Sequence, residues 1–212
     1  VEKVLQIKNL ITIEYQDMEE NYVYPTETHD FYELIYIEKG SLTCKIEDFE
    51  FSLTQNDFIL IDPNKSHSYY LNDKQTSKNL IICFNSKSEI LGVLKGKIVL
   101  SEREKTFISD IIMESRKCFV FPFKKKLVPL DSPRFGSQQL VESYIEQLLI
   151  SVIRKTLDNK KEIMLIYKLN DKGHNKNHIE FVLKTEYEDH NFEYVFDFHN
   201  DILCIILCNF IY

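Results

Sequence analysis

The chain has 212 residues, of which 26 are basic and 33 acidic, and its formal net charge is −7 at pH 7. Hydrophobic residues make up 44% and aromatic residues 13% of the sequence, which indicates a folded globular protein and excludes a disordered chain. The acidic balance also argues against a surface built chiefly to bind nucleic acid, because such a surface carries a basic face.

Targeting and membrane segments are not predicted from the sequence. No basic segment precedes a short apolar run, and no stretch of 18 apolar residues occurs, so we expect neither a signal peptide nor a membrane span and place the chain in the cytoplasm. The cysteines are odd in number and form no C-x-x-C pair, which predicts reduced, mostly buried thiols. They are Cys44, Cys83, Cys118, Cys204 and Cys208.

Residues 11–84 have the pattern of consecutive short strands. Turn residues such as Gly40-Ser41, Asn56-Asp57 and Pro63-Asn64 separate the apolar runs, and asparagine tolerates the positive φ that such turns need. Regular short strands without an intervening helix indicate a sandwich or barrel. The predicted strands are 11–15, 33–39, 42–46, 49–53, 58–61, 68–71 and 80–84.

Two short motifs predict a pocket among these strands. The first is His29-x3-Glu33-x6-Gly40, and the second runs from Asn56 through a Pro-Asn turn to His67. Because side chains alternate between the faces of a strand, His29 shares a face with Glu33, and polar groups at such positions can line an interior that holds one small ligand. The predicted ligand-binding residues are His29, Phe31, Glu33, His67, Tyr69 and Tyr24.

The pattern becomes helical after Ser86. Ser101 and Glu104 form a capping box that opens a helix of about four to five turns. A proline-containing connector follows, and we expect its lysines at 124–126 to form a solvated loop. A second helix, over 137–157, carries an apolar stripe wider than one small barrel face requires, which predicts contact with another chain. The expected dimer-interface residues are Leu140, Tyr144, Leu148, Leu149 and Val152.

These motifs resemble a known family. The segments beginning at His29 and Asn56 resemble the two cupin motifs. The Phe-Gly-Ser-Gln-Gln-Leu run at 135–140, leading into Leu-Leu-Ile at 148–150 and then Arg154, is similar to the AraC/XylS class of bacterial transcription regulators. The resemblance covers residues 20 to 157. It implies a cupin barrel that senses a small effector, helices that form the dimer, and a C-terminal pair of helix-turn-helix units that binds DNA.

The resemblance leads to a specific expectation of fold and organisation. We expect a mainly β protein with appended helices: a cupin-like (jelly-roll) barrel over 1–85, an antiparallel helical dimerisation segment over 86–160, and a linker with an aberrant tail over 161–212. The implied function is the effector-sensing and dimerisation part of a regulator, without enzyme activity. Its implied partners are a second copy of the chain and a sugar or other hydroxylated or carboxylated metabolite.

The C-terminal region departs from the family pattern. Only 53 residues follow Asn159, whereas a helix-turn-helix pair with its linker needs about a hundred. Residues 179–184 look like the start of a first DNA-binding helix, but residues 185–212 contain no Lys or Arg and six acidic residues. Because phosphate contacts need cations, we expect DNA binding only through a region missing or degraded here. The apolar end at 202–212 is interpreted as a truncation or frame-shift, with a genuine strand as the alternative.

Two other functions stay open at this point. Metal-dependent cupins usually bring His-x-His before the glutamate, and this chain has Glu27-Thr28-His29, so one histidine is absent, although Glu27 would supply a replacement donor. We therefore expect no metal and no other cofactor, with a metal-dependent dioxygenase or isomerase as the enzymatic alternative. No Walker loop or dinucleotide fingerprint is present. The third hypothesis is a dimerisation decoy, a chain that pairs with intact relatives and so titrates them.

Overall fold

The computed structural model describes residues 3–72, 74–123, 125–170, 179–181, 194–199 and 202–207, with side chains as far as residue 159. The chain divides into two compact units, Val1–Lys160 and Lys161–Tyr212. Among the described residues, no helix combines the length and the apolar character that crossing a membrane requires.

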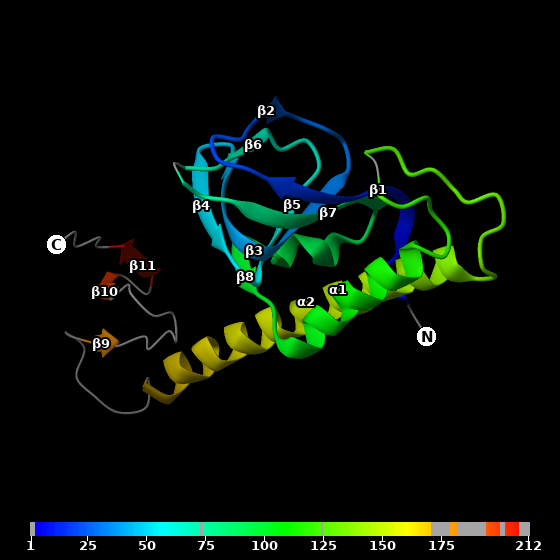
Figure 1. Ribbon diagram of the computed structural model, residues 1–212. Coiled ribbons are helices and arrows are strands. Elements are labelled where there is room, and N and C mark those ends of the chain that lie inside the picture. Colours follow the sequence, from blue (N-terminus) through cyan, green and yellow to red (C-terminus); the bar gives the residue numbers. More distant parts are fainter. Residues whose placement is uncertain are drawn as a thin grey trace. The chain divides into compact units, whose positions relative to one another are not determined.

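Among the described residues before Lys160, eight strands precede the two helices α1 and α2 (Figure 1). A short 3-10 helix, Glu89–Val93, precedes the last of these strands. Helix α1 spans Glu102–Ser115 and helix α2 spans Ser137–Asn170. The strands are β1 (Ile7–Met18), β2 (Val23–Glu27), β3 (Tyr32–Ile46), β4 (Phe49–Thr54), β5 (Asp57–Ile61), β6 (His67–Tyr70), β7 (Ser77–Ser86) and β8 (Lys97–Val99).

The strands pair in antiparallel fashion into two layers that share β3. The first layer has the order β1-β7-β3-β5-β8, and the second contains β4, the C-terminal half of β3, β6 and β2. The pairing does not close into a complete ring among the described strands. The predicted fold class, a mainly β cupin-like jelly roll with appended helices, is confirmed.

Strand β3 differs from its prediction. A turn was expected at Gly40 between two strands, but Tyr32–Ile46 is one continuous strand that pairs with β5 and β7 in its first half and with β4 and β6 in its second. Gly40 has φ +82°, and a Cβ there would lie 1.9 Å from the carbonyl oxygen of Thr76. Glycine therefore lets the strand bend from one layer into the other without reversing direction.

The turn prediction was correct at the two asparagines. Asn56 has φ 73° and Asn64 has φ 63°, so both adopt the left-handed conformation that asparagine tolerates. Strands β2 and β8 were not predicted. β2 contains Pro25 and no buried residue, so it lacks the alternation by which a strand is recognised in a sequence.

The first layer is covered on both of its faces. One face, with Ile35, Ile59 and Ile81, packs against the second layer in an interior cluster. The opposite face, with Leu34 and Leu60, packs against the helices. All five residues of β5 are buried for this reason, so the strand reads as a continuous apolar run after Asp57.

Helix α2 covers this outer face together with α1. Leu148, Leu149 and Val152 are fully buried in the same core cluster as Leu34 and Leu60. The prediction that these three residues contact a partner chain is therefore wrong, because the chain's own sheet and helix α1 already cover them. Leu140, 43% exposed, and the half-buried Tyr144 keep surface that a partner could contact.

The predicted capping box of α1 is confirmed. The backbone N–H of Glu104 donates to Ser101 Oγ, and the backbone N–H of Ser101 donates to the Glu104 carboxylate over 2.7 Å. The Glu104 carboxylate also accepts a hydrogen bond from Ser151 on α2, at 3.1 Å. One buried glutamate thus starts α1 and fixes it to α2.

The second unit contains a three-stranded antiparallel sheet in the order β11-β10-β9. Its strands are β9 (Ile179–Phe181), β10 (Tyr194–His199) and β11 (Ile202–Leu207). The expected start of a DNA-binding helix is wrong for residues 179–181, which form β9, and residues 182–184 lie outside the described residues. The alternative interpretation of the apolar end as a strand holds for residues 202–207.

Candidate metal and ligand site

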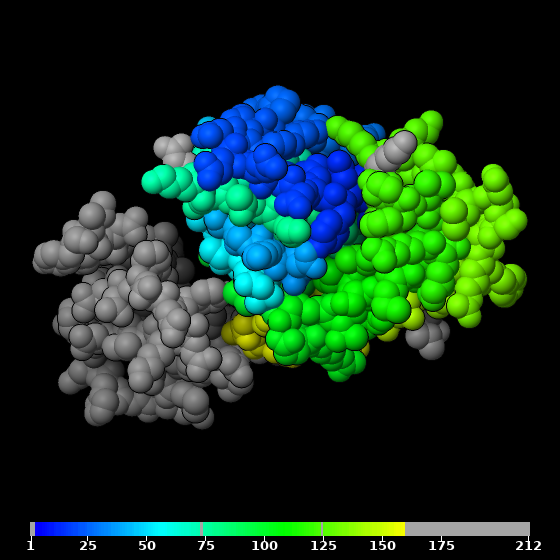
Figure 2. Space-filling view, viewed as in Figure 1, coloured from blue at the N-terminus to red at the C-terminus, as the bar shows by residue number. Residues whose placement is uncertain are grey.

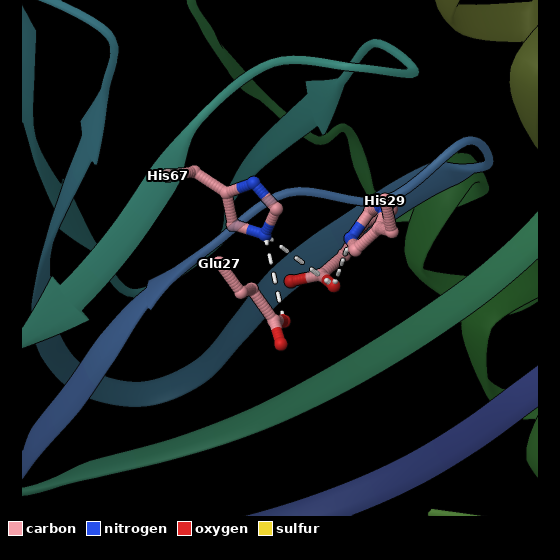
Figure 3. A group of neighbouring side chains, drawn as sticks. Glu27, His29 and His67 are labelled. Atoms are coloured by element: carbon pink, nitrogen blue, oxygen red, sulfur yellow. Dashed lines mark hydrogen bonds and ion pairs between the residues drawn. The ribbon is translucent and has the colours of Figure 1, made fainter.

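Four ionisable side chains converge where the two layers meet. Glu27 is the last residue of β2 and pairs with His67, the first residue of β6. Glu33 lies at the start of β3, and His29 lies in the segment between β2 and β3. Figure 3 shows the side chains of Glu27, His29 and His67 pointing toward one another. The backbone N–H of Asn64 donates to the carbonyl of His29 over 2.7 Å, so the turn before β6 holds this segment in place.

The donor atoms of the four residues form a compact group. One ligand atom from each of the four lies within 4.8 Å of the others. His29 Nε2 lies 3.3 Å from Glu33 Oε2. His67 Nε2 lies 3.7 Å from Glu27 Oε1 and 3.9 Å from Glu33 Oε2. Two histidine nitrogens therefore face two carboxylates around one shared point.

Backbone carbonyls orient both imidazole rings. His29 Nδ1 donates to the carbonyl of Phe31 at 3.0 Å, and His67 Nδ1 donates to the carbonyl of Lys65 at 2.9 Å. A carbonyl oxygen only accepts, so each Nδ1 carries the proton, and a neutral ring then presents the lone pair of Nε2 to the carboxylates. Two acceptors repel one another unless a proton or a cation lies between them. Metal-binding histidines are commonly held in this way.

A proton between His29 Nε2 and Glu33 Oε2 completes a hydrogen bond there, whereas His67 Nε2 has no hydrogen-bond partner. Burial lowers the pKa of His29, but its hydrogen bond to Glu33 and the charge of Glu33 outweigh that effect and raise the pKa overall. His67 Nε2 and Glu33 Oε1 are both buried and have no hydrogen-bond partner. Buried polar atoms without partners cost free energy, so both atoms are available to bind a polar ligand or a metal ion.

The residues fit a divalent transition-metal ion. Two donors that each lie about 2.1 Å from one ion can be at most about 4.2 Å apart, so the separations of 3.3, 3.7 and 3.9 Å are compatible with a shared ion. Side-chain adjustments of a few tenths of an ångström would accommodate the widest separation, 4.8 Å. Two imidazoles and two carboxylates suit zinc, iron, manganese or nickel. The sequence-based expectation of no metal stays a prediction, and this geometry weighs against it.

Aromatic side chains surround the four donors. The rings of His29 and Phe31 stack at 3.8 Å, and those of Tyr24 and Tyr69 stack at 4.5 Å. The Tyr24 hydroxyl donates to Glu27 Oε2 over 3.0 Å. Burial is the main cause of the raised pKa of Tyr69, so its hydroxyl stays neutral. The structure thus brings together all six predicted ligand-binding residues, which are Tyr24, His29, Phe31, Glu33, His67 and Tyr69.

The predicted ligand-binding set leaves out three residues of this site. Glu27 was considered only as a replacement donor. Cys83, on β7 opposite Glu33, places its sulfur 3.6 Å from Glu33 Oε2. Lys125 was expected in a solvated loop, but its ammonium lies 2.9 Å from the Tyr24 hydroxyl and 3.9 Å from Glu27 Oε2. A histidine motif lacking one histidine, with a glutamate two positions before His29, is the signal that identifies Glu27.

A separate recess of about 340 Å³ lies at the start of α2 and is lined by other residues. It is mostly apolar, and none of the four donors lines it. The donor cluster and this recess are therefore separate features of the described part of the chain.

Residues 12–87 match the family model described as the AraC-like ligand binding domain. The matched segment begins within β1 and ends just after β7, so it contains all four donors. A comparison with curated proteins found no match. The match to the AraC-like ligand binding domain supports a sensing role for this part of the chain.

Several solved structures, among them a cupin superfamily protein, are similar to part of the chain. A cupin superfamily protein of Desulfitobacterium hafniense is 18% identical, with a TM-score of 0.33 over 36% of this chain and 69% of its own. A predicted oxalate decarboxylase of Thermotoga maritima is 15% identical, with a TM-score of 0.33 over 34% and 64%. The polyketide cyclase RemF of Streptomyces resistomycificus is 16% identical, with a TM-score of 0.34 over 48% and 70%. At these values the matches carry no information on activity.

Proposed function

We propose that the AraC-like ligand binding domain of this chain binds a small effector at the site formed by Glu27, His29, Glu33 and His67. In this proposal the chain is the sensing part of a transcription regulator. A divalent metal ion held by these four residues belongs to the site and supplies a positive charge for an oxygen atom of the effector. The stacked aromatic rings around the donors provide apolar surface for its carbon skeleton.

The observation that carries the proposal is the pair of buried, unpartnered atoms His67 Nε2 and Glu33 Oε1. A purely structural cluster would satisfy both atoms within the protein, because each unsatisfied buried polar group costs about 1–3 kcal/mol. Here the backbone fixes the His67 ring through Nδ1 and leaves Nε2 facing the carboxylates. A site held open in this way is suited to receive a ligand.

The chain's own groups have separate tasks in this proposal. His29 and His67 donate neutral nitrogens, and Glu27 and Glu33 balance the charge of the ion. The Tyr24 hydroxyl keeps the Glu27 carboxylate in position through its hydrogen bond. The buried Tyr69 ring, stacked on Tyr24, keeps water away from this side of the site.

A thermal-shift screen of small metabolites, with and without added divalent metal, tests the sensing role. We expect a stabilising metabolite for the wild-type chain and none for Glu33→Gln, which keeps the side-chain volume but removes the charge. Glu47→Gln is the matched control, because Glu47 lies in the turn between β3 and β4 and pairs with Lys65. Equal responses of the two variants to the same metabolite would place its binding site elsewhere.

The regulator part of the proposal rests on the family resemblance, with dimerisation and DNA contact as further proposals. We expect that this chain alone does not bind DNA sequence-specifically, because residues 185–212 contain no Lys or Arg to contact phosphates. A mobility shift at low salt checks this. Saturable, sequence-dependent retention would mean that the C-terminal region takes part in DNA binding.

A metal-dependent cupin enzyme is the second candidate, and the four-donor geometry is the observation that favours it. A catalytic metal site keeps a position open for substrate, whereas a sensor needs only binding. Turnover of an effector by the metal-loaded chain, lost in Glu33→Gln, would favour the enzyme. Stoichiometric binding of an effector that is recovered unchanged would favour the sensor.

A further inference from the structure

The connector between α1 and α2, residues 116–136, places one lysine at the edge of the donor site. The carbonyl of Lys125 accepts a hydrogen bond from Thr12 Oγ1 of β1 at 2.7 Å, which fixes the backbone. Its ammonium donates to the Tyr24 hydroxyl at 2.9 Å and lies 3.9 Å from Glu27 Oε2. In Figure 2 the light-green connector lies against the blue surface of the N-terminal strands.

Lys125 combines a fixed backbone with a largely free side chain. The side chain is 74% exposed, so its ammonium keeps most of its water and can exchange partners at little cost. The ammonium also lies 5.6 Å from the centre of the Tyr24 ring, a cation–π distance. These contacts keep the Lys125 ammonium at the edge of the site, where it forms no buried ion pair and can still bind another anion.

The charge balance of the site decides what Lys125 can do. Glu27 and Glu33 together carry two negative charges, which a bound divalent ion neutralises. The ammonium beside Glu27 then adds a positive charge that the two carboxylates no longer balance. A site of this kind favours an anionic ligand over a neutral one of the same shape.

We propose that Lys125 determines the specificity of this site by binding a carboxylate group of the effector. This inference rests on the proposed function and narrows the effector to a carboxylate-bearing metabolite.

Calorimetric titration of the metal-loaded chain with paired probes tests the inference. The probes are malonate and succinate, each compared with its neutral diamide, and free metal is removed beforehand. We expect each dicarboxylate to bind about fivefold more tightly than its diamide, because an ion pair with a largely exposed ammonium contributes at most about 1 kcal/mol. Lys125→Gln should remove most of this preference, and Lys125→Arg should keep it.

The control is Lys126→Gln, which removes the next charge on the same connector, at an exposed position. An equal loss of the dicarboxylate preference in Lys125→Gln and Lys126→Gln would show that only the net charge of the connector matters, and would overturn the inference. A dicarboxylate preference that is unchanged in Lys125→Gln would overturn it and leave the proposed function standing. If no probe binds either the wild-type chain or Lys125→Gln and the metal itself fails to load, the proposed function fails and the inference fails with it.

Discussion

Cys83 and Glu33 lie directly opposite each other on β7 and β3, and the Cys83 thiol donates a hydrogen bond to Glu33 Oε2 over 3.6 Å. Burial, and secondarily the charge of Glu33, raises the pKa of Cys83, so the thiol keeps the proton it donates. The contact holds one oxygen of Glu33 beside His29 and leaves the other, Oε1, without a partner. The thiol thus orients the carboxylate without competing for its free oxygen.

Replacing Cys83 by Val should lower the metal affinity of the site by about tenfold, at the weak end of the effects that supporting partners have on metal sites. The fold should persist, because valine fills a similar apolar volume. Cys83→Ser should retain most of the affinity, since its hydroxyl can also donate to Glu33. Metal titration monitored by calorimetry measures the change.

The matched control for this experiment is Cys44→Val, because Cys44 is fully buried in the same interior cluster and shares no hydrogen bond with Glu33 among the contacts of the described residues. Equal loss of affinity in both variants would assign the effect to packing rather than to the thiol.

Helix α2 should respond differently to charges on its two sides. Leu148→Glu should unfold the chain, because Leu148 is fully buried against the sheet and α1, and burying an unpaired charge there costs several kcal/mol. Leu140→Glu should leave the fold intact, because Leu140 is 43% exposed. If the N-terminal end of α2 forms the homodimer contact, Leu140→Glu also yields monomers in sedimentation experiments. A folded, dimeric Leu148→Glu variant would contradict the packing described here.

The pH dependence of stability should change sign when metal binds. In the metal-free chain, the raised pKa of His29 means that its proton stabilises the fold below the unfolded pKa of about 6.5, and this contribution is lost as pH rises through the raised value. In the metal-loaded chain, protons compete with the ion for the histidines, so stability gained from the metal grows with rising pH. Thermal melts between pH 5.5 and about 8, with metal and with chelator, should show opposite trends. Parallel trends would argue against a histidine-bound ion.

The sequence predicted the parts of the site that depend on local alternation. The alternation rule selected His29 and Glu33 correctly, but His29 precedes β3, and its direction is set by the hydrogen bonds of this segment to Phe31 and Asn64. Glu27 was not placed in the ligand set because β2 lacks alternation and its pairing with β6 is a tertiary feature. Lys125 depends in the same way on how the connector folds back over β1, which no local pattern encodes.

The apolar stripe of α2 illustrates a different limit of sequence reasoning. Its width was interpreted as a dimer interface, although a second apolar surface within the chain could also cover it. The continuous run Phe58-Ile59-Leu60-Ile61 in β5 indicates a strand that is buried on both faces. Considered together, the two patterns predict that the helix packs on the sheet, as the core cluster shows.

Titration of the chelator-stripped chain with Zn²⁺, Mn²⁺ or Co²⁺ tests the four-donor site most directly. We predict one equivalent of metal per chain, with a Kd that weakens by at least about a hundredfold in His67→Ala and in Glu27→Ala, because each loses a direct ligand. Glu47→Gln should bind as the wild-type chain does. Absence of binding, or binding that His67→Ala and Glu27→Ala leave unchanged, would contradict the assignment of Glu27, His29, Glu33 and His67 as a metal and ligand site.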